Sequence, residues 1–153
     1  ERNTAMDTET INRLTKHLIR LAAENLTVVQ TDPDLAHIAQ AGQNPDLSEG
    51  ALDTLADKAR SLSIRGESQS TPKHYAAAVL KHALNYRLFH MQGEPHEAYL
   101  TLHNYPSVFV IAQDLEAGVS QDVNSPEGRA AIESVKNALI TRCPAFDAAF
   151  SNR

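Results

Sequence analysis

The fold is decided by residues 71–91, TPKHYAAAVLKHALNYRLFHM. Thr71 followed by Pro72 is typical of a helix start. The threonine oxygen can accept from free backbone N–H groups, and proline at the first helical position has no N–H to leave unpaired. The residues that follow are apolar on nearly every side and rich in alanine, so neighbouring helices can approach closely. We therefore expect a central helix from Pro72 to about Met91.

The same pattern of helix boundaries recurs along the chain. A capping residue and a proline precede each of several apolar-periodic runs, and glycines follow such runs. The pairs are Asp32-Pro33 and Ser125-Pro126, and the glycines are Gly42, Gly66 and Gly93. Glycine is the residue that most often ends a helix, because it adopts the left-handed backbone conformation without strain. The chain is therefore predicted to be a series of helices with short joints.

Apolar residues recur at spacings of three and four in every long segment, which indicates one buried stripe per helix. The expected helices cover residues 7–26, 33–41, 48–64, 72–91, 95–103, 106–120 and 125–142, with a last turn or two around Phe146 and Phe150. A strand competes only at residues 108–111, where β-branched and aromatic residues meet, and the helical spacing is favoured there too. The prediction is an all-α, single-domain bundle of about six to seven helices over residues 7–153. Residues 1–6 are expected to be an added remnant or a disordered N-terminus.

The composition limits the classes of partner that the chain is expected to bind. The 153 residues carry a formal net charge of −5 and a pI near 5.8, which argues against partners such as nucleic acid or an anionic membrane. A local basic patch could override that balance. Arg13, Lys16 and Arg20 lie off the apolar stripe of the first helix and are expected to be solvated. Without a signal-peptide pattern or a membrane-length apolar run, we expect a cytoplasmic protein.

Residues that could carry chemistry do not form a recognisable pattern. The histidines at 74, 82 and 90 are eight residues apart, so their side chains point in different directions around the helix and cannot bind one metal ion together. His96 and His103 would share a face, but two ligands are too few for a metal site. Cys143 is expected to be a small structural thiol. No nucleophile motif or phosphate-binding glycine loop occurs. We therefore expect a protein without metal, cofactor or enzymatic activity.

Aromatic and arginine side chains gather around the turn between the helices expected at 72–91 and 95–103. Such residues are over-represented in protein interfaces. The predicted partner-binding residues are Tyr86, Arg87, Tyr99 and Tyr105 at this turn, and Asp32 and Asp34 on an acidic edge that also includes Asp46. The alternative is that the residues at the turn fill the core beneath it.

The predicted function is binding of another protein, by a small acidic adaptor or a cognate inhibitor of the immunity or antitoxin type. The acidity predicts a partner with a basic patch. Two alternatives stay open: a bundle that holds a small apolar ligand between the helices at 72–91, 106–120 and 125–142, and a helical domain of a secreted effector. A protein binder should expose an aromatic or charged patch, whereas a ligand binder should enclose an apolar pocket.

Overall fold

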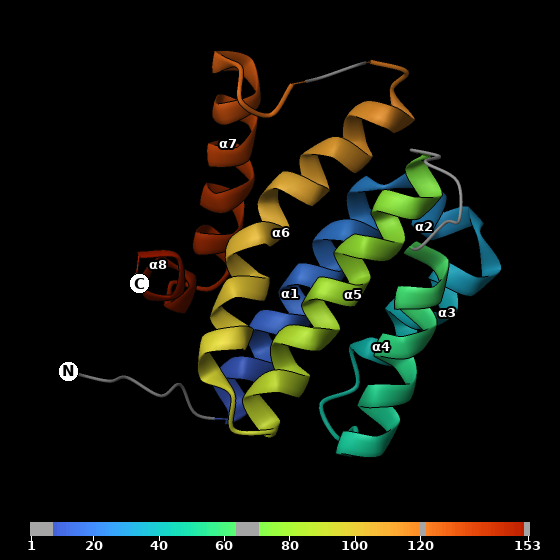
Figure 1. Cartoon of the computed structure of the whole chain (residues 1–153), viewed down its shortest axis with the longest axis vertical. Helices are drawn as coiled ribbons and strands as arrows, with labels where there is room; N and C mark the ends of the chain where they lie inside the picture. The colour runs from blue at the N-terminus through green and yellow to red at the C-terminus, as the bar shows by residue number, and fades with distance from the viewer. Residues whose placement is uncertain (1–7, 64–70, 120–121, 152–153) are drawn as a thin grey trace.

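The computed structural model describes residues 8–63, 71–119 and 122–151, and all regular structure in these ranges is helical. The helices are α1 (Thr8–Asn25), α2 (Thr27–Thr31), α3 (Pro33–Gly42), α4 (Glu49–Ser63), α5 (Pro72–Met91), α6 (Pro95–Glu116), α7 (Pro126–Arg142) and α8 (Ala145–Ser151). They pack together as a bundle (Figure 1). The all-α prediction is confirmed, but eight helices are present in the described ranges instead of six or seven.

The helices differ from the prediction in three places: one added helix and the fusion of two predicted helices leave the count unchanged, and the predicted last turn or two, which is the helix α8, brings it to eight. A short helix, α2, follows α1 and was not predicted. The helices predicted at 95–103 and 106–120 are one helix, α6, with Pro106 inside it. Proline removes one backbone hydrogen bond and usually kinks or ends a helix. Here its neighbours Tyr105 and Phe109 are buried, and this tertiary packing holds the helix together through the proline. The segment 108–111 is helical, as expected.

The predicted helix starts are confirmed, with proline at the first turn in each case. The side chain of Asp32 accepts from the N–H groups of two residues of α3, Thr71 caps α5, and Ser125 caps α7. Ser48, at the start of α4, accepts from the N–H of Ala51 at 3.1 Å. These caps satisfy N–H groups that a helix leaves open at its first turn.

The two described glycines of the prediction, Gly42 and Gly93, lie where helices end, but only Gly93 does so with a positive φ. Gly93 has φ of +77°, and Gly118, which follows α6, has φ of +74°. Gly42 is the last residue of α3 and has no positive φ. A Cβ at Gly42 would come within 2.9 Å of Ile19 Cδ1, a terminal methyl group that can move aside, so the glycine marks a close approach of α3 to the core. Gly66 lies outside the described residues.

The predicted centre of the bundle is confirmed, since α5 packs most extensively on α6, α4 and α1. Figure 1 shows α5 between α4 and α6, with α1 behind it. Ala78 is half-buried, whereas the fully buried residues of this helix include Ala76, Ala77, Val79, Leu80, Ala83 and Leu84. Burial on several sides matches an alanine-rich sequence without a marked polar face.

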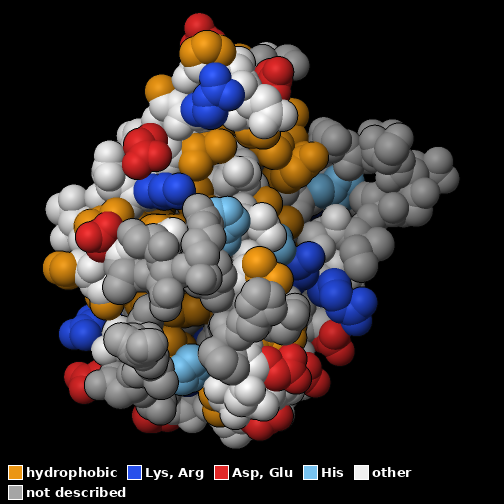
Figure 2. All heavy atoms as spheres, turned by 60° about the vertical axis from the view of Figure 1, so that its left-hand side comes forward, with side chains coloured by type: hydrophobic (Ala, Val, Ile, Leu, Met, Phe, Trp, Pro, Cys, Tyr) orange, Lys and Arg blue, Asp and Glu red, His pale blue; other side chains and the backbone are white. Residues whose placement is uncertain are grey.

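The C-terminal helices cover one side of this core. In α8 the rings of Phe146 and Phe150 stack with centroids 5.6 Å apart, and both side chains are buried, as the prediction of a docked last turn requires. In α7, by contrast, only Gly128 and Leu139 are buried among the described residues. Figure 2 shows hydrophobic side chains still visible on this side, below the N-terminal end of α7 at the top of the molecule.

Candidate partner-binding site

The turn between α5 and α6 does not present the predicted anchor residues. Tyr86 and Arg87 are each 3% exposed, and Tyr105 is fully buried. The side chain of Tyr99 lies outside the described residues. For the three described residues, the structure corresponds to the alternative in which they fill the core beneath the turn. A partner could not reach them without a rearrangement of the bundle.

Arg87 fixes a loop. Its two terminal nitrogens donate to the carbonyl oxygens of Asn44 and Pro45, at 2.9 and 2.8 Å, in the connection between α3 and α4. Burial lowers the pKa of Arg87, and the nearby Asp46 carboxylate opposes that shift. The remaining guanidinium nitrogen, Nε, is buried without a hydrogen-bond partner. The arginine therefore ties residues 44–46 to the centre of the bundle.

Tyr105 ties α6 to α1. Its hydroxyl donates to the carbonyl oxygen of Leu18 at 2.7 Å, and its ring lies 6.0 Å from that of Phe109. Burial raises the pKa of both Tyr105 and Tyr86 above their ordinary values. Both phenols thus stay protonated, and Tyr105 serves as a buried donor.

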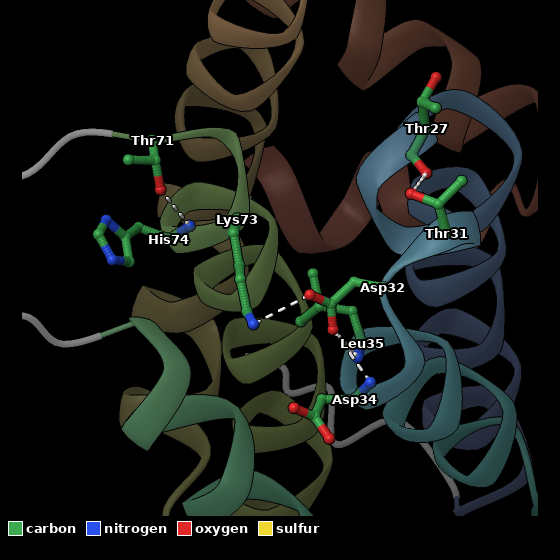
Figure 3. Close-up of polar contacts among 8 residues, drawn as sticks. All are labelled: Thr27, Thr31, Asp32, Asp34, Leu35, Thr71, Lys73 and His74. Carbon is green, nitrogen blue, oxygen red and sulfur yellow. Dashed lines mark hydrogen bonds and ion pairs between the residues drawn. The ribbon is translucent and has the colours of Figure 1, made fainter.

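The two predicted acids lie at the joint between α2 and α3. Asp32 forms an ion pair with Lys73 of α5, with 2.9 Å between Oδ2 and Nζ. Its other oxygen accepts from the N–H groups of Asp34 and Leu35, at 3.0 and 3.2 Å. The hydrogen bond from Lys73 is the main reason that the pKa of Asp32 is lowered. Figure 3 shows Lys73 reaching across from α5 to this joint.

Asp34 is exposed at the same joint, whereas Asp46 is not part of it. Asp46 follows the opposite end of α3, a helix of 10 residues, which at 1.5 Å per residue is about 15 Å long. The structure therefore brings Asp32 and Asp34 together and separates them from Asp46. The predicted acidic edge is not one continuous surface.

An open groove of about 500 Å³ lies beside this joint. It is formed where α2, the start of α5 and the end of α6 meet. Its lining residues are Thr27, Val28, Thr31, Thr71, Pro72, Lys73 and Glu116. Three threonines give it hydroxyl groups, and Lys73 and Glu116 give it charge. We call this feature the threonine groove.

Glu116, at the end of α6, links α6 to α2 on one side of the groove. Its two carboxylate oxygens accept from the N–H groups of Thr27 and Val28, at 2.9 and 2.7 Å. A carboxylate at this position satisfies the open N–H groups of α2 and complements the partial positive charge there. Because Thr27 and Glu116 are 89 residues apart, the sequence alone offered no signal for this contact.

The histidines have separate surroundings. Burial is the main cause that lowers the pKa of His82 to about 4, whereas His37 is exposed. His74 is buried at the start of α5, and the side chain of His96 lies outside the described residues. Among the described residues, no group of three or more histidine, cysteine or acidic side chains is placed to hold a metal ion. Cys143 is buried at the end of α7.

Comparisons of the chain with protein-family models, with curated proteins and with solved structures found no match. Within the described ranges, none of the helices is both long and apolar enough to span a lipid bilayer.

Proposed function

We propose that this chain is a non-enzymatic protein-binding module, a small acidic adaptor or cognate inhibitor that acts in the cytoplasm. Its partner would present a segment with a basic side chain to the threonine groove. This assignment moves the binding surface from the turn between α5 and α6 to the opposite ends of these helices, beside Asp32 and Asp34.

The observation that supports this proposal is the form of the groove. A site for a small apolar ligand usually encloses its ligand within apolar walls. The threonine groove is open to solvent, and Lys73 and Glu116 line it. An open groove with hydroxyl and charged groups fits a segment of another protein better, because the partner's backbone and side chains can both find hydrogen bonds there.

Local charge supports a basic partner. Among the described residues at or beside the groove, Asp32, Asp34 and Glu116 contribute three carboxylates, against the ammonium group of Lys73. The net charge of the whole chain has the same sign. Opposite charge on a partner would increase the rate of association, and added salt would reduce it.

A matched pair of substitutions tests the groove. Thr31 and Thr54 are both exposed, and each hydroxyl donates to the carbonyl oxygen four residues earlier in its helix. Thr31→Arg places a long cationic side chain in the groove, whereas Thr54→Arg places it on α4. Wild-type protein, immobilised and exposed to an extract of its native cells, supplies the partner, whose affinity for each variant is then measured by calorimetry.

We expect Thr54→Arg to bind the partner as the wild type does. Thr31→Arg should bind about tenfold more weakly or worse, the loss expected when a like charge and a steric block enter a binding site. Equal binding by both variants would place the surface elsewhere. If the wild-type protein retains no partner, the proposal of a protein-binding function fails.

A further inference from the structure

A second charged surface lies along α1. Arg13, Lys16 and Arg20 follow one another at spacings of three and four residues, so they share the outer face of the helix. Arg13 and Lys16 are exposed and Arg20 is half-buried. None of the three makes an ion pair or hydrogen bond with another described residue. At 1.5 Å per residue, they extend over about 10 Å.

A fourth cation joins them from α7. Arg142 pairs with Glu24 of α1 at 3.1 Å and lies close enough to influence His17. Around His17, the charged groups that act on the imidazole are Arg13, Lys16 and Arg20 of its own helix and Arg142 of α7, and all four are cationic. The pKa of His17 is lowered, first by burial and then by these cations. Its Nδ1 atom is buried without a hydrogen-bond partner.

What distinguishes this surface is that three cations without an ion pair among the described residues lie next to one another on one helix face. The chain's 14 lysines and arginines are outnumbered by 19 acidic residues, so a cation on the surface has many carboxylates to pair with. Elsewhere among the described residues, Lys73, Arg60 and Arg142 each lie within 3.1 Å of a carboxylate. Cations such as Lys58 and Lys81 have no ion pair there, but they are not part of such a run. Among the described residues the three cations of α1 have no ion-pair partner, and because they are adjacent they repel one another. An external anion would relieve this repulsion.

We infer that Arg13, Lys16 and Arg20, with Arg142 beside them, form a docking surface for an acidic helical segment of a partner protein. We call it the α1 basic strip. An acidic helix can place carboxylates at the same three- and four-residue spacing, so that each faces one cation. Arginine binds a carboxylate with two parallel hydrogen bonds, which gives such pairs directional preference.

Charge and extent favour this occupant over other polyanions. Double-stranded DNA carries a charge about every 1.7 Å, so its binding depends on many contacts along a long basic face. The strip has a few cations over about 10 Å, on a chain whose net charge of −5 repels a polyanion at long range. A short acidic helix contacts the strip and little else, so that repulsion matters least for it.

The surface is independent of the threonine groove, because it uses no residue of that site. The probe is an alanine-based helical peptide with glutamates along one face, titrated into the full chain at low salt and followed by NMR. Binding should shift the ring resonances of His17. It should also raise the pKa of His17, because the glutamates offset the four cations that lower it.

Two triple variants that have the same net charge distinguish an effect of the strip itself from an effect of the overall charge of the chain. Arg13→Gln, Lys16→Gln and Arg20→Gln remove the strip. Lys58→Gln, Arg60→Gln and Arg129→Gln remove one lysine and two arginines that are exposed elsewhere. The control should bind the peptide as the wild type does, and the strip variant about tenfold more weakly, because several exposed pairs each contribute a little. Lys16→Glu alone, measured by the same titration, gives a second test if the triple variant does not fold.

Several results would overturn the inference. The strip variant could bind the peptide as well as the control, or the wild type could show no shift at His17. Duplex DNA or vesicles containing phosphatidylserine could bind the strip more tightly than the peptide. Sedimentation could also show that the chain alone self-associates through the strip, in which case a second copy is the occupant.

Discussion

Replacing Gly128 by alanine is expected to destabilise the protein, although the same change usually stabilises a helix. Gly128 lies in the first turn of α7 and is buried. A Cβ there would lie 2.3 Å from the carbonyl oxygen of Asp122 and 2.6 Å from Cα of Val123. Both are backbone atoms, so no change of rotamer relieves the contact. The turn must open, and the hydrogen bond from the Gly128 N–H to Ser125 Oγ, 3.0 Å long, is strained or lost.

The magnitude follows from three contributions. Overpacking costs about 1–3 kcal/mol, and the upper end applies because the obstacle is backbone. Loss of the cap costs about 1 kcal/mol. The higher helix propensity of alanine offsets about 1 kcal/mol of this loss in the free energy of unfolding. The net loss in free energy of unfolding is about 3 kcal/mol, which for a chain of this size lowers Tm by about 6–12 °C.

Gly50 provides the control within the same chain. It lies near the start of α4, is exposed, and has no atom within 4 Å of its added Cβ. Gly50→Ala should therefore raise the free energy of unfolding by about 0.5–1 kcal/mol. Urea unfolding followed by circular dichroism measures both variants. A Gly128→Ala protein as stable as the wild type, or more stable, would refute the reasoning about the backbone contact.

Further predictions concern buried polar groups. Arg87→Met should lower the free energy of unfolding in urea by about 2–3 kcal/mol, because two charge-assisted hydrogen bonds are lost while the burial cost of the charge is relieved; an unchanged midpoint would contradict the role given to this arginine. Tyr105→Phe should cost about 1 kcal/mol in the same assay, for one buried hydrogen bond, and a cost near zero would show that the bond is not formed. Asp32→Ala should cost about 1–2 kcal/mol and Asp32→Asn clearly less, because asparagine keeps the helix cap and loses only the ion pair; equal losses would assign the effect to the ion pair. The pKa of His82 falls from 6.5 to about 4 on folding, so below pH 6.5 protons bind the unfolded state more tightly than the folded one. The free energy of unfolding should therefore be constant with respect to His82 above pH 6.5 and fall by about 3 kcal/mol as the pH falls toward 4. His82→Gln should flatten that part of the curve of stability against pH, and His37→Gln, an exposed control, should not.

Local signals predicted most of the fold, because caps and apolar spacing act within a few residues. Thr71-Pro72 starts α5 where it was expected, and Gly93, with a positive φ, follows the C-terminal end of the same helix. The errors arose where distant contacts outweigh local preference. Pro106 predicts a break, yet buried neighbours on both sides keep α6 continuous. Gly42 is where α3 ends, as predicted, but the close approach of Ile19 and Leu84 to it could not be anticipated from local sequence.

The site was harder to predict, for a physical reason. Tyrosine and arginine are favoured in interfaces because they combine packing area with hydrogen bonds. The same two properties suit a core that must satisfy a carbonyl group, as Tyr105 does for Leu18. Residue type therefore cannot separate an interface from a core, and only the position of the acceptor decides. For Arg87 the acceptors lie 42 and 43 residues away in sequence.

A run of adjacent like charges is a more useful surface signal in this protein than residue type alone. A buried arginine such as Arg87 needs acceptors, so its presence is explained by the fold itself. Arg13, Lys16 and Arg20 satisfy nothing within the described residues, and their mutual repulsion reduces stability. Their place on an exposed helix face follows from the apolar stripe that the sequence shows. Their lack of partners follows only from the structure, because it depends on where the acidic residues of the other helices lie.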